Sequence, residues 1–178
     1  MSKTMPTRYH PFLVSLHWLT VLLVFAALGL GKLMSGQPND ATKIPLLAAH
    51  MALGLVTLVV IVGRFIVRLR LPKPAHASTG NALLDKIGEV VHYALYLLVL
   101  LMSISGMSLS VQSGLTPIVF GASGTSLPAD FYAFSARLLH GFVAPVLLLL
   151  VLLHIGAAFY HQLVLKDNLL ARMWYKNS

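Results

Sequence analysis

Four histidines of this chain lie within long apolar stretches, where a polar imidazole is costly and usually marks function. They are His17, His50, His140 and His154. The chain contains no cysteine, which excludes thiolate ligation, iron–sulfur clusters, covalent haem attachment and disulfides. The simplest chemistry that remains for four such histidines is axial ligation of the iron of two b-type haems. These haems would be held by ligation and packing alone.

The spacing of the histidines predicts two ligand pairs at two depths. His140 and His154 are 14 residues apart, roughly four helical turns, so both project from nearly one face about 21 Å apart. His17, near the start of the first apolar segment, lies level with His154. His50, near the start of the second, lies level with His140. We therefore expect the pairs His17/His154 and His50/His140, each clamped between two helices of a bundle.

Other histidines have to be weighed against this pairing. A lone membrane histidine is as often a hydrogen bonder between helices as a ligand, but four at two matched depths favour haem. His92, near the start of the third apolar segment, competes with His17 for the inner site and stays as the alternative ligand. The remaining three lie near the interface, where a solvated role is the default; they are His10, His76 and His161.

Two further residues of the second apolar segment fit a haem. Arg64 follows His50 by 14 residues, so it shares the face of His50 at the opposite end. There it could pair with the propionates of the inner haem, although its position equally suits a topogenic arginine that snorkels to the interface. Gly54 would let a flat macrocycle approach the backbone, and its alternative role is close helix packing.

The elements that position these residues are four apolar segments, each long enough for a membrane-spanning helix, which needs about 20 residues. They run roughly over residues 12–34, 44–69, 83–111 and 131–165. The composition agrees, because 10% of the residues are charged against about 25% in soluble domains. We expect a single all-α integral membrane domain over residues 1–178, built as a four-helix transmembrane bundle. The first segment is longer than the apolar core of roughly 7–15 residues in a signal peptide, so we interpret it as a membrane helix.

Most basic residues behind the formal net charge of +8 flank the apolar runs, so we interpret this charge as a signal for the orientation of the helices in the membrane. The basic residues form no patch interleaved with aromatics, and we therefore expect no nucleic-acid partner. One side of the bundle carries most of them, namely Lys3, Arg8, Arg64, Arg68, Arg70, Lys73, Lys86, Lys166, Arg172 and Lys176. The other side carries Lys32, Lys43 and Arg137. The positive-inside rule therefore predicts that both termini are cytoplasmic. Residues 112–130 form the longest outer segment, which we expect to act as a lid.

Several strings of residues resemble the bacterial cytochrome b561 family over essentially the whole chain. They are Leu16-His17-Trp18, His50-x3-Gly54-x9-Arg64, His140 with His154, and the tail Lys166-Asp167-Asn168-x-Leu170-x-Arg172-Met173. The resemblance implies a multi-pass protein of the bacterial inner membrane with two b haems in the pairing given above. Because described relatives are superoxide oxidases, it also implies electron transfer from periplasmic superoxide to ubiquinone. The spacing His154-x6-His161 matches the family, in which the second histidine is associated with the quinone site.

The chain departs from the family pattern at two places. It has Gln162 where relatives often carry another histidine, and the residues that follow His140 are apolar where those of relatives are more polar.

The expected partners are membrane lipid, ubiquinone and superoxide. A slight excess of basic residues on the outer side would attract a small anion. The oligomeric state carries no expectation.

Two other functions are compatible with a bundle of apolar helices that contains histidines. The alternative is an electron-conducting cytochrome b anchor subunit of a larger respiratory or hydrogenase-type complex, although the short loops offer no obvious docking face. A small transporter with histidine proton relays is disfavoured, since membrane carboxylates and paired broken helices are lacking.

Overall fold

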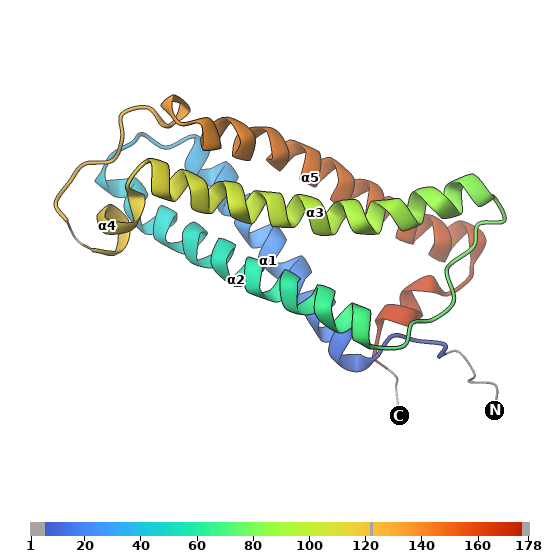
Figure 1. The fold of residues 1–178 in the computed structure, drawn as a ribbon. Helices are drawn as coiled ribbons and strands as arrows, with labels where there is room; N and C mark the ends of the chain where they lie inside the picture. The colour runs from blue at the N-terminus through green and yellow to red at the C-terminus, as the bar shows by residue number, and fades with distance from the viewer. Residues whose placement is uncertain (1–5, 122, 176–178) are drawn as a thin grey trace.

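A computed structural model describes residues 6–121 and 123–175 of the chain. Four long helices dominate it (Figure 1). They are α1 (Pro11–Ser35), α2 (Ile44–Arg70), α3 (Ala82–Gln112) and α5 (Ser135–Tyr160). Each belongs to a segment that is long and apolar enough to cross a membrane. The prediction of an all-helical membrane bundle with four spans is therefore confirmed.

The helices pack so that both ends of the described chain lie at one end of the bundle. Helix α1 packs against α2, α3 against α5, and α2 against α3. The start of α1, the C-terminal segment and the connection formed by residues 71–81 lie together, whereas the short helix α4 (Leu115–Phe120) lies at the opposite end (Figure 1). We call these the terminal end and the α4 end.

An aliphatic layer occupies the interior between the two ends. It consists of one buried side chain from each long helix, namely Val24, Ile61, Val99 and Leu147. A second apolar cluster closes the α4 end, with Met34, Leu47, Leu115 and Leu127 at its centre. Close van der Waals packing of these side chains stabilises the contacts between the helices, because lipid leaves no hydrophobic driving force for helix association in a membrane.

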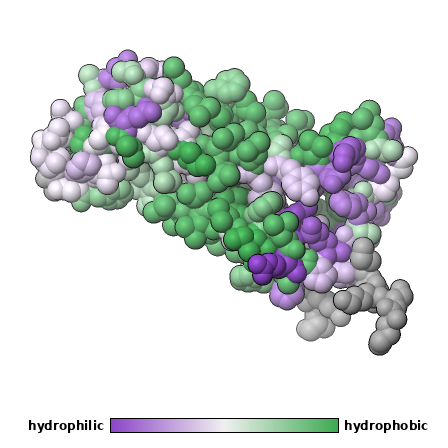
Figure 2. Space-filling view, viewed as in Figure 1, coloured by the Kyte–Doolittle hydropathy of each residue, from purple (hydrophilic) through white to green (hydrophobic). Residues whose placement is uncertain are grey.

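The outside of the bundle is an apolar belt with more polar ends. Large hydrophobic side chains are exposed on every long helix; for example, Leu22 is 69% exposed and Phe142 is 70% exposed. Figure 2 shows this belt as a hydrophobic middle with hydrophilic residues gathered toward each end. In a membrane the belt faces lipid, which solvates these side chains at no cost.

Capping residues fix where two of the long helices begin. The ring of His10 accepts a hydrogen bond from the Phe12 N–H, and Pro11 opens α1. The Asn81 side chain caps α3 by accepting from the Leu83 and Leu84 N–H groups. Both arrangements satisfy backbone donors that a helix start leaves free.

The fourth apolar segment is divided, although the sequence predicted one element over residues 131–165. A 3₁₀ turn, η2 (Phe131–Ala133), precedes α5, and Phe134 between them is extended. After Tyr160 the chain continues as a π-helix, η3 (His161–Leu165). A π-helical turn is often found at functional sites, and this one carries His161.

The predicted outer loop also contains structure that the sequence did not indicate. Gly114 adopts a left-handed conformation (φ 63°) and turns the chain from α3 into α4. The Ser110 and Thr116 hydroxyls are 3.0 Å apart across this turn, and Leu115 is buried. The first part of residues 112–130 is therefore packed against the bundle.

Candidate functional site

At the α4 end, His50 from α2 and His140 from α5 face each other across the bundle. Their ring centres are 6.1 Å apart, and the ring planes are 78° from parallel. Two imidazoles on opposite sides of one metal ion, at about 2 Å per bond, have ring centres roughly 6 Å apart. The pair therefore has the separation that two axial ligands of one haem iron require.

The hydrogen bonds of His140 leave one ring nitrogen available for a metal. Its Nδ1 lies 3.0 Å from the Ser105 Oγ, and this hydroxyl donates to the Met102 carbonyl. Because the hydroxyl proton is already used, the Ser105 oxygen accepts the Nδ1 proton of His140. The lone pair of this tautomer, assigned from the hydrogen bonds, is then on Nε2, as in most metal-ligating histidines.

Glycines make room for both rings and for a flat group beside them. A Cβ atom at Gly31 would lie 3.4 Å from the His50 Cε1, and one at Gly106 would lie 3.2 Å from the His140 Cε1. At Gly54, one turn after His50, a Cβ would meet nothing within 4 Å. The backbone next to this histidine pair is therefore open to the approach of a haem plane.

At the terminal end, one polar residue from each long helix joins a second cluster. Its members are His17 from α1, Arg64 from α2, His92 from α3 and His154 from α5. The Arg64 Nη2 lies 2.9 Å from the His17 Nδ1, and the ring centres of His92 and His154 are 5.1 Å apart. The ring that lies beside His154 is thus that of His92, whereas the depth argument expected His17.

The partners of His17 and His92 set different tautomers. A guanidinium can only donate, so the Nδ1 of His17 accepts from Arg64 and the proton of the neutral ring is on Nε2. The His92 Nδ1 lies 2.7 Å from the Gly88 carbonyl, which can only accept, so its Nε2 carries the lone pair. In this arrangement the Nε2 lone pair of His92 is free for a metal, whereas the lone pair of His17 is taken by Arg64 and becomes free only when that hydrogen bond is released.

Two buried polar atoms beside this cluster suit an anionic group. The Arg64 Nε and the Tyr96 hydroxyl are buried and have no hydrogen-bond partner in the described part of the chain. The guanidinium carbon of Arg64 lies 5.2 Å from the centre of the Tyr96 ring. Buried polar groups are rarely left unpaired, and a haem propionate would satisfy both. Sequence reasoning missed Tyr96, although it follows His92 by one helical turn on the same face.

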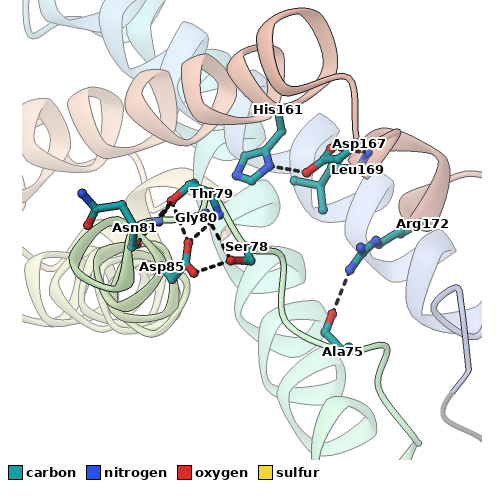
Figure 3. A network of polar contacts seen from close by, with 10 residues as sticks. All are labelled: Ala75, Ser78, Thr79, Gly80, Asn81, Asp85, His161, Asp167, Leu169 and Arg172. Atoms are coloured by element: carbon teal, nitrogen blue, oxygen red, sulfur yellow. Dashed lines mark hydrogen bonds and ion pairs between the residues drawn. The ribbon is translucent and has the colours of Figure 1, made fainter.

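His161 is buried, although the sequence left a solvated role as its default. Its Nδ1 donates to the Asp167 Oδ2 over 2.6 Å (Figure 3). The other carboxylate oxygen, Oδ1, accepts from the Leu169 N–H over 3.0 Å. Partial desolvation raises the pKa of Asp167, but the hydrogen bonds from His161 and from this backbone N–H outweigh it and leave the pKa below its ordinary value.

The turn that holds Asp167 is conformationally costly. Lys166 and Asn168, its two neighbours, are the described non-glycine residues with positive φ, at 54° and 55°. A left-handed conformation costs a residue such as lysine about 1–2 kcal/mol, whereas asparagine tolerates it better. Such conformations persist where the surrounding structure enforces them, often at functional sites.

The C-terminal segment completes the terminal end. Two hydrogen bonds hold the 3₁₀ helix η4 (Leu169–Met173) in place. The Tyr9 N–H donates to the Arg172 carbonyl, and the Arg172 side chain donates to the Ala75 carbonyl (Figure 3). Beside it is a groove of about 380 Å³ that is lined by Arg8, Gln162, Asn168, Leu170, Ala171, Trp174 and Tyr175. The buried Oε1 of Gln162 has no hydrogen-bond partner among the described residues.

Two cations are positioned near the histidine pair of the α4 end. Lys43 is buried and donates to the Gln37 carbonyl and the Asn39 Oδ1, at 2.9 and 2.8 Å. It precedes His50 by about two turns along the chain, and Arg137 precedes His140 by about one turn. Within the described ranges, neither cation has a carboxylate oxygen within 4.0 Å. Their charge therefore remains available to an approaching anion.

The chemistry of the donor set fits haem better than a metal held by protein ligands alone. Within residues 6–121 and 123–175, no group of three or more His, Cys, Asp or Glu residues could hold a metal ion. Haem iron needs only two axial protein ligands, and both ends of the bundle offer at least two histidines.

Comparison with known proteins finds relatives among bacterial cytochromes. Residues 8–176 match the family model described as prokaryotic cytochrome b561. The probable superoxide oxidase CybB of Yersinia pestis is 29% identical, with 97% of this chain and 98% of that protein aligned. Cytochrome b561 homolog 2 of Escherichia coli K12 is 30% identical over 97% of this chain and 94% of its own length. Cytochrome b562 of Cereibacter sphaeroides is 30% identical, with 96% of this chain and 97% of that protein aligned.

Proposed function

The chain belongs to the prokaryotic cytochrome b561 family of haem b-binding membrane electron carriers, and we propose that it is a dihaem superoxide:ubiquinone oxidoreductase. Its family and its four apolar helices make it a multi-pass protein of the bacterial inner membrane. In the proposed reaction, two superoxide ions each lose one electron and leave as O₂ at the α4 end. One ubiquinone takes up the two electrons and two protons at the terminal end.

The observation that carries this proposal is the presence of two histidine sites at opposite ends of one bundle, with an aliphatic layer between them. We propose His50 and His140 as the axial ligands at the α4 end and His17 and His154 at the terminal end, with His92 as the alternative to His17. Haem iron supplies one-electron redox chemistry when it is bound at such ligands.

The remaining residues position these ligands and exclude water. Ser105 holds the His140 ring through its Nδ1, and Gly31 and Gly106 give the two rings space. Arg64 and Tyr96 offer buried donors to the propionates of the group at the terminal end. The aliphatic side chains between the sites keep the interior dry, which strengthens the effect of each of these polar contacts.

The α4 end is the proposed site of superoxide oxidation. A relative bears the name of a probable superoxide oxidase, and superoxide is a small anion. Lys43 and Arg137, which have no carboxylate partner among the described residues, would attract such an anion toward the His50/His140 pair. No nucleophile or acid–base pair is needed, since oxidation of superoxide removes only an electron.

The proposed orientation puts the terminal end in the cytoplasm. That end carries most of the lysines and arginines of the chain, as the positive-inside rule requires. Superoxide would then arrive from the periplasm, and the protons of ubiquinol would be taken from the cytoplasmic side.

Haem stoichiometry and stopped-flow reduction test the proposal. We expect a pyridine haemochrome assay to return two b haems per chain. We also expect superoxide alone to reduce the protein, and ubiquinone to reoxidise it. One haem per chain would contradict the two-site assignment. Two haems with no reduction by superoxide would favour the electron-conducting anchor subunit.

A further inference from the structure

We propose that Asp167 is the positioning residue of a proton-donating pair with His161, and that this pair protonates the reduced quinone. The inference rests on the proposed reduction of ubiquinone at the terminal end. It adds a role for a carboxylate that contacts no candidate haem ligand in the described structure.

The geometry of the pair fixes both the tautomer and the direction of His161. A carboxylate only accepts hydrogen bonds, so the proton shared over 2.6 Å is on the His161 Nδ1. The opposite ring nitrogen, Nε2, has no hydrogen-bond partner among the described residues. When the ring is protonated, Nε2–H is the proton that a substrate can receive. The histidine side chain is 11% exposed and the carboxylate 25% exposed, so the pair lies between the protein interior and water.

The turn around Asp167 holds both of its carboxylate oxygens. Oδ1 accepts from the Leu169 N–H and Oδ2 accepts from His161 (Figure 3). The left-handed residues on either side, Lys166 and Asn168, direct this side chain back toward the π-helix. The carboxylate therefore orients the imidazole and also stabilises its protonated form, as an acidic partner does in other acid–base pairs.

The other charged and titratable groups near His161 are hydrogen-bonded to other residues or lie too far from its ring to bond it. Asp85, at the start of α3, accepts hydrogen bonds from the Ser78 hydroxyl and from the N–H and hydroxyl of Thr79 (Figure 3). Arg172 is held by the Ala75 carbonyl. The Tyr160 ring centre lies 6.4 Å from that of His161. Asp167 is thus the one described carboxylate that contacts the imidazole.

The proposed step moves protons and no electrons. After ubiquinone has accepted electrons, one of its oxygens takes the Nε2 proton of the imidazolium, so an O–H bond forms as the N–H bond breaks. The neutral ring keeps the proton on its Nδ1, which stays hydrogen-bonded to the Asp167 carboxylate, and its Nε2 takes up a new proton from the solvent. A second cycle supplies the second proton of ubiquinol. Asp167 ends each cycle as the carboxylate with which it began.

The test uses the full-length, haem-loaded protein, reduced with dithionite under anaerobic conditions so that it does not depend on superoxide. Reoxidation by ubiquinone-1 is followed by stopped flow between pH 5.5 and pH 9 for wild type, Asp167→Asn, Asp167→Glu, His161→Ala and the Asp167→Asn/His161→Ala double variant. In Asp167→Asn we expect unchanged haem content and spectra, because asparagine keeps an oxygen for the Leu169 N–H. We expect reoxidation to slow about tenfold or more at neutral pH.

Three readouts separate a role in proton donation from a merely structural one. In Asp167→Asn, the rate should decline with rising pH from a lower pH than in wild type, because the imidazolium has lost its counter-charge. Asp167→Glu should recover part of the rate. In the His161→Ala background, Asp167→Asn should have no further effect, because Asp167 acts through His161. As a control, Glu89→Gln removes a partly exposed carboxylate that pairs with Lys86 and should leave reoxidation unchanged.

The outcomes distinguish this inference from the function on which it rests. A wild-type rate and pH profile in Asp167→Asn, with His161→Ala slow, would overturn the pairing and leave the proposed function intact. Additive effects in the double variant would do the same. A wild-type rate in His161→Ala would overturn the assignment of proton donation to His161, and the role of Asp167 with it.

Discussion

The Nδ1 of His140 and the hydroxyl of Ser105 are 3.0 Å apart, and this hydrogen bond decides which nitrogen of the histidine faces a ligand. Removing the hydroxyl should therefore loosen the ring. We expect Ser105→Ala to lower haem affinity at the α4 end by about tenfold or more, which is the usual effect of losing such a partner. Haem titration followed by absorbance measures this. Ser103→Ala is the matched control, since the Ser103 hydroxyl bonds the Val99 carbonyl.

The ligand assignment predicts selective loss of one haem. His50→Ala or His140→Ala should remove the haem of the α4 end and keep the other, so that the haem content falls by half. His154→Ala should remove the haem of the terminal end.

The partner of His154 is decided by a direct comparison of two variants. We expect His17→Ala to abolish the haem of the terminal end and His92→Ala to retain it, as the depth argument predicts. The opposite result would assign ligation to the ring that lies 5.1 Å from His154 and leave His17 as a partner of Arg64 only.

A methyl group at Gly106 should displace His140. The added Cβ would lie 3.2 Å from the His140 Cε1, which is tighter than ordinary van der Waals contact. We expect Gly106→Ala to weaken haem binding at the α4 end and to alter its low-spin spectrum. In Gly29→Ala the Cβ would meet nothing within 4 Å, so this variant should bind haem as wild type does. Equal spectra for the two variants would contradict the close packing of the ring.

Loss of the Arg64 charge should lower the midpoint potential of the haem at the terminal end. Without a cation near the propionates, the oxidised iron, which carries the greater positive charge, becomes relatively more stable. A tenfold change in that balance would correspond to about 60 mV for one electron. We expect Arg64→Gln to shift the potential downward in a spectroelectrochemical titration and Tyr96→Phe to shift it less. An unchanged potential in Arg64→Gln would favour the topogenic role.

The acid side of the stability profile should depend on Asp167. Because the pKa of Asp167 is held below its ordinary value, folding favours its ionised form. The resulting stabilisation is present above about pH 4, the pKa of an unfolded aspartate, and is lost as pH falls through the lower folded value. Thermal unfolding of wild type and Asp167→Asn across pH 2.5–7 checks this. The difference between them should shrink at the acid end.

The sequence predicted the four long helices because the length of an apolar run is set by the thickness of the bilayer and needs no knowledge of packing. The meeting of His50 and His140 followed from depth alone. The neighbour of His154 could not be predicted in this way, because depth along a helix says nothing about rotation around its axis. In the structure the His92 ring lies beside His154, whereas His17 bonds Arg64. Ser105 and Tyr96 were missed for a similar reason, since their roles depend on which helix lies opposite. Asp167 was visible only as part of a tail motif.

The aliphatic layer of Val24, Ile61, Val99 and Leu147 also has an electrical consequence. It lies within the low-dielectric part of the bundle, across which the transmembrane voltage falls. An electron that crosses the whole voltage drop toward a negative cytoplasm works against about 2.3 kcal/mol per 100 mV. In the proposed orientation, a highly energised membrane would therefore oppose inward electron flow, and its collapse would release that flow. The rate of electron transfer through the bundle would then depend directly on the membrane potential.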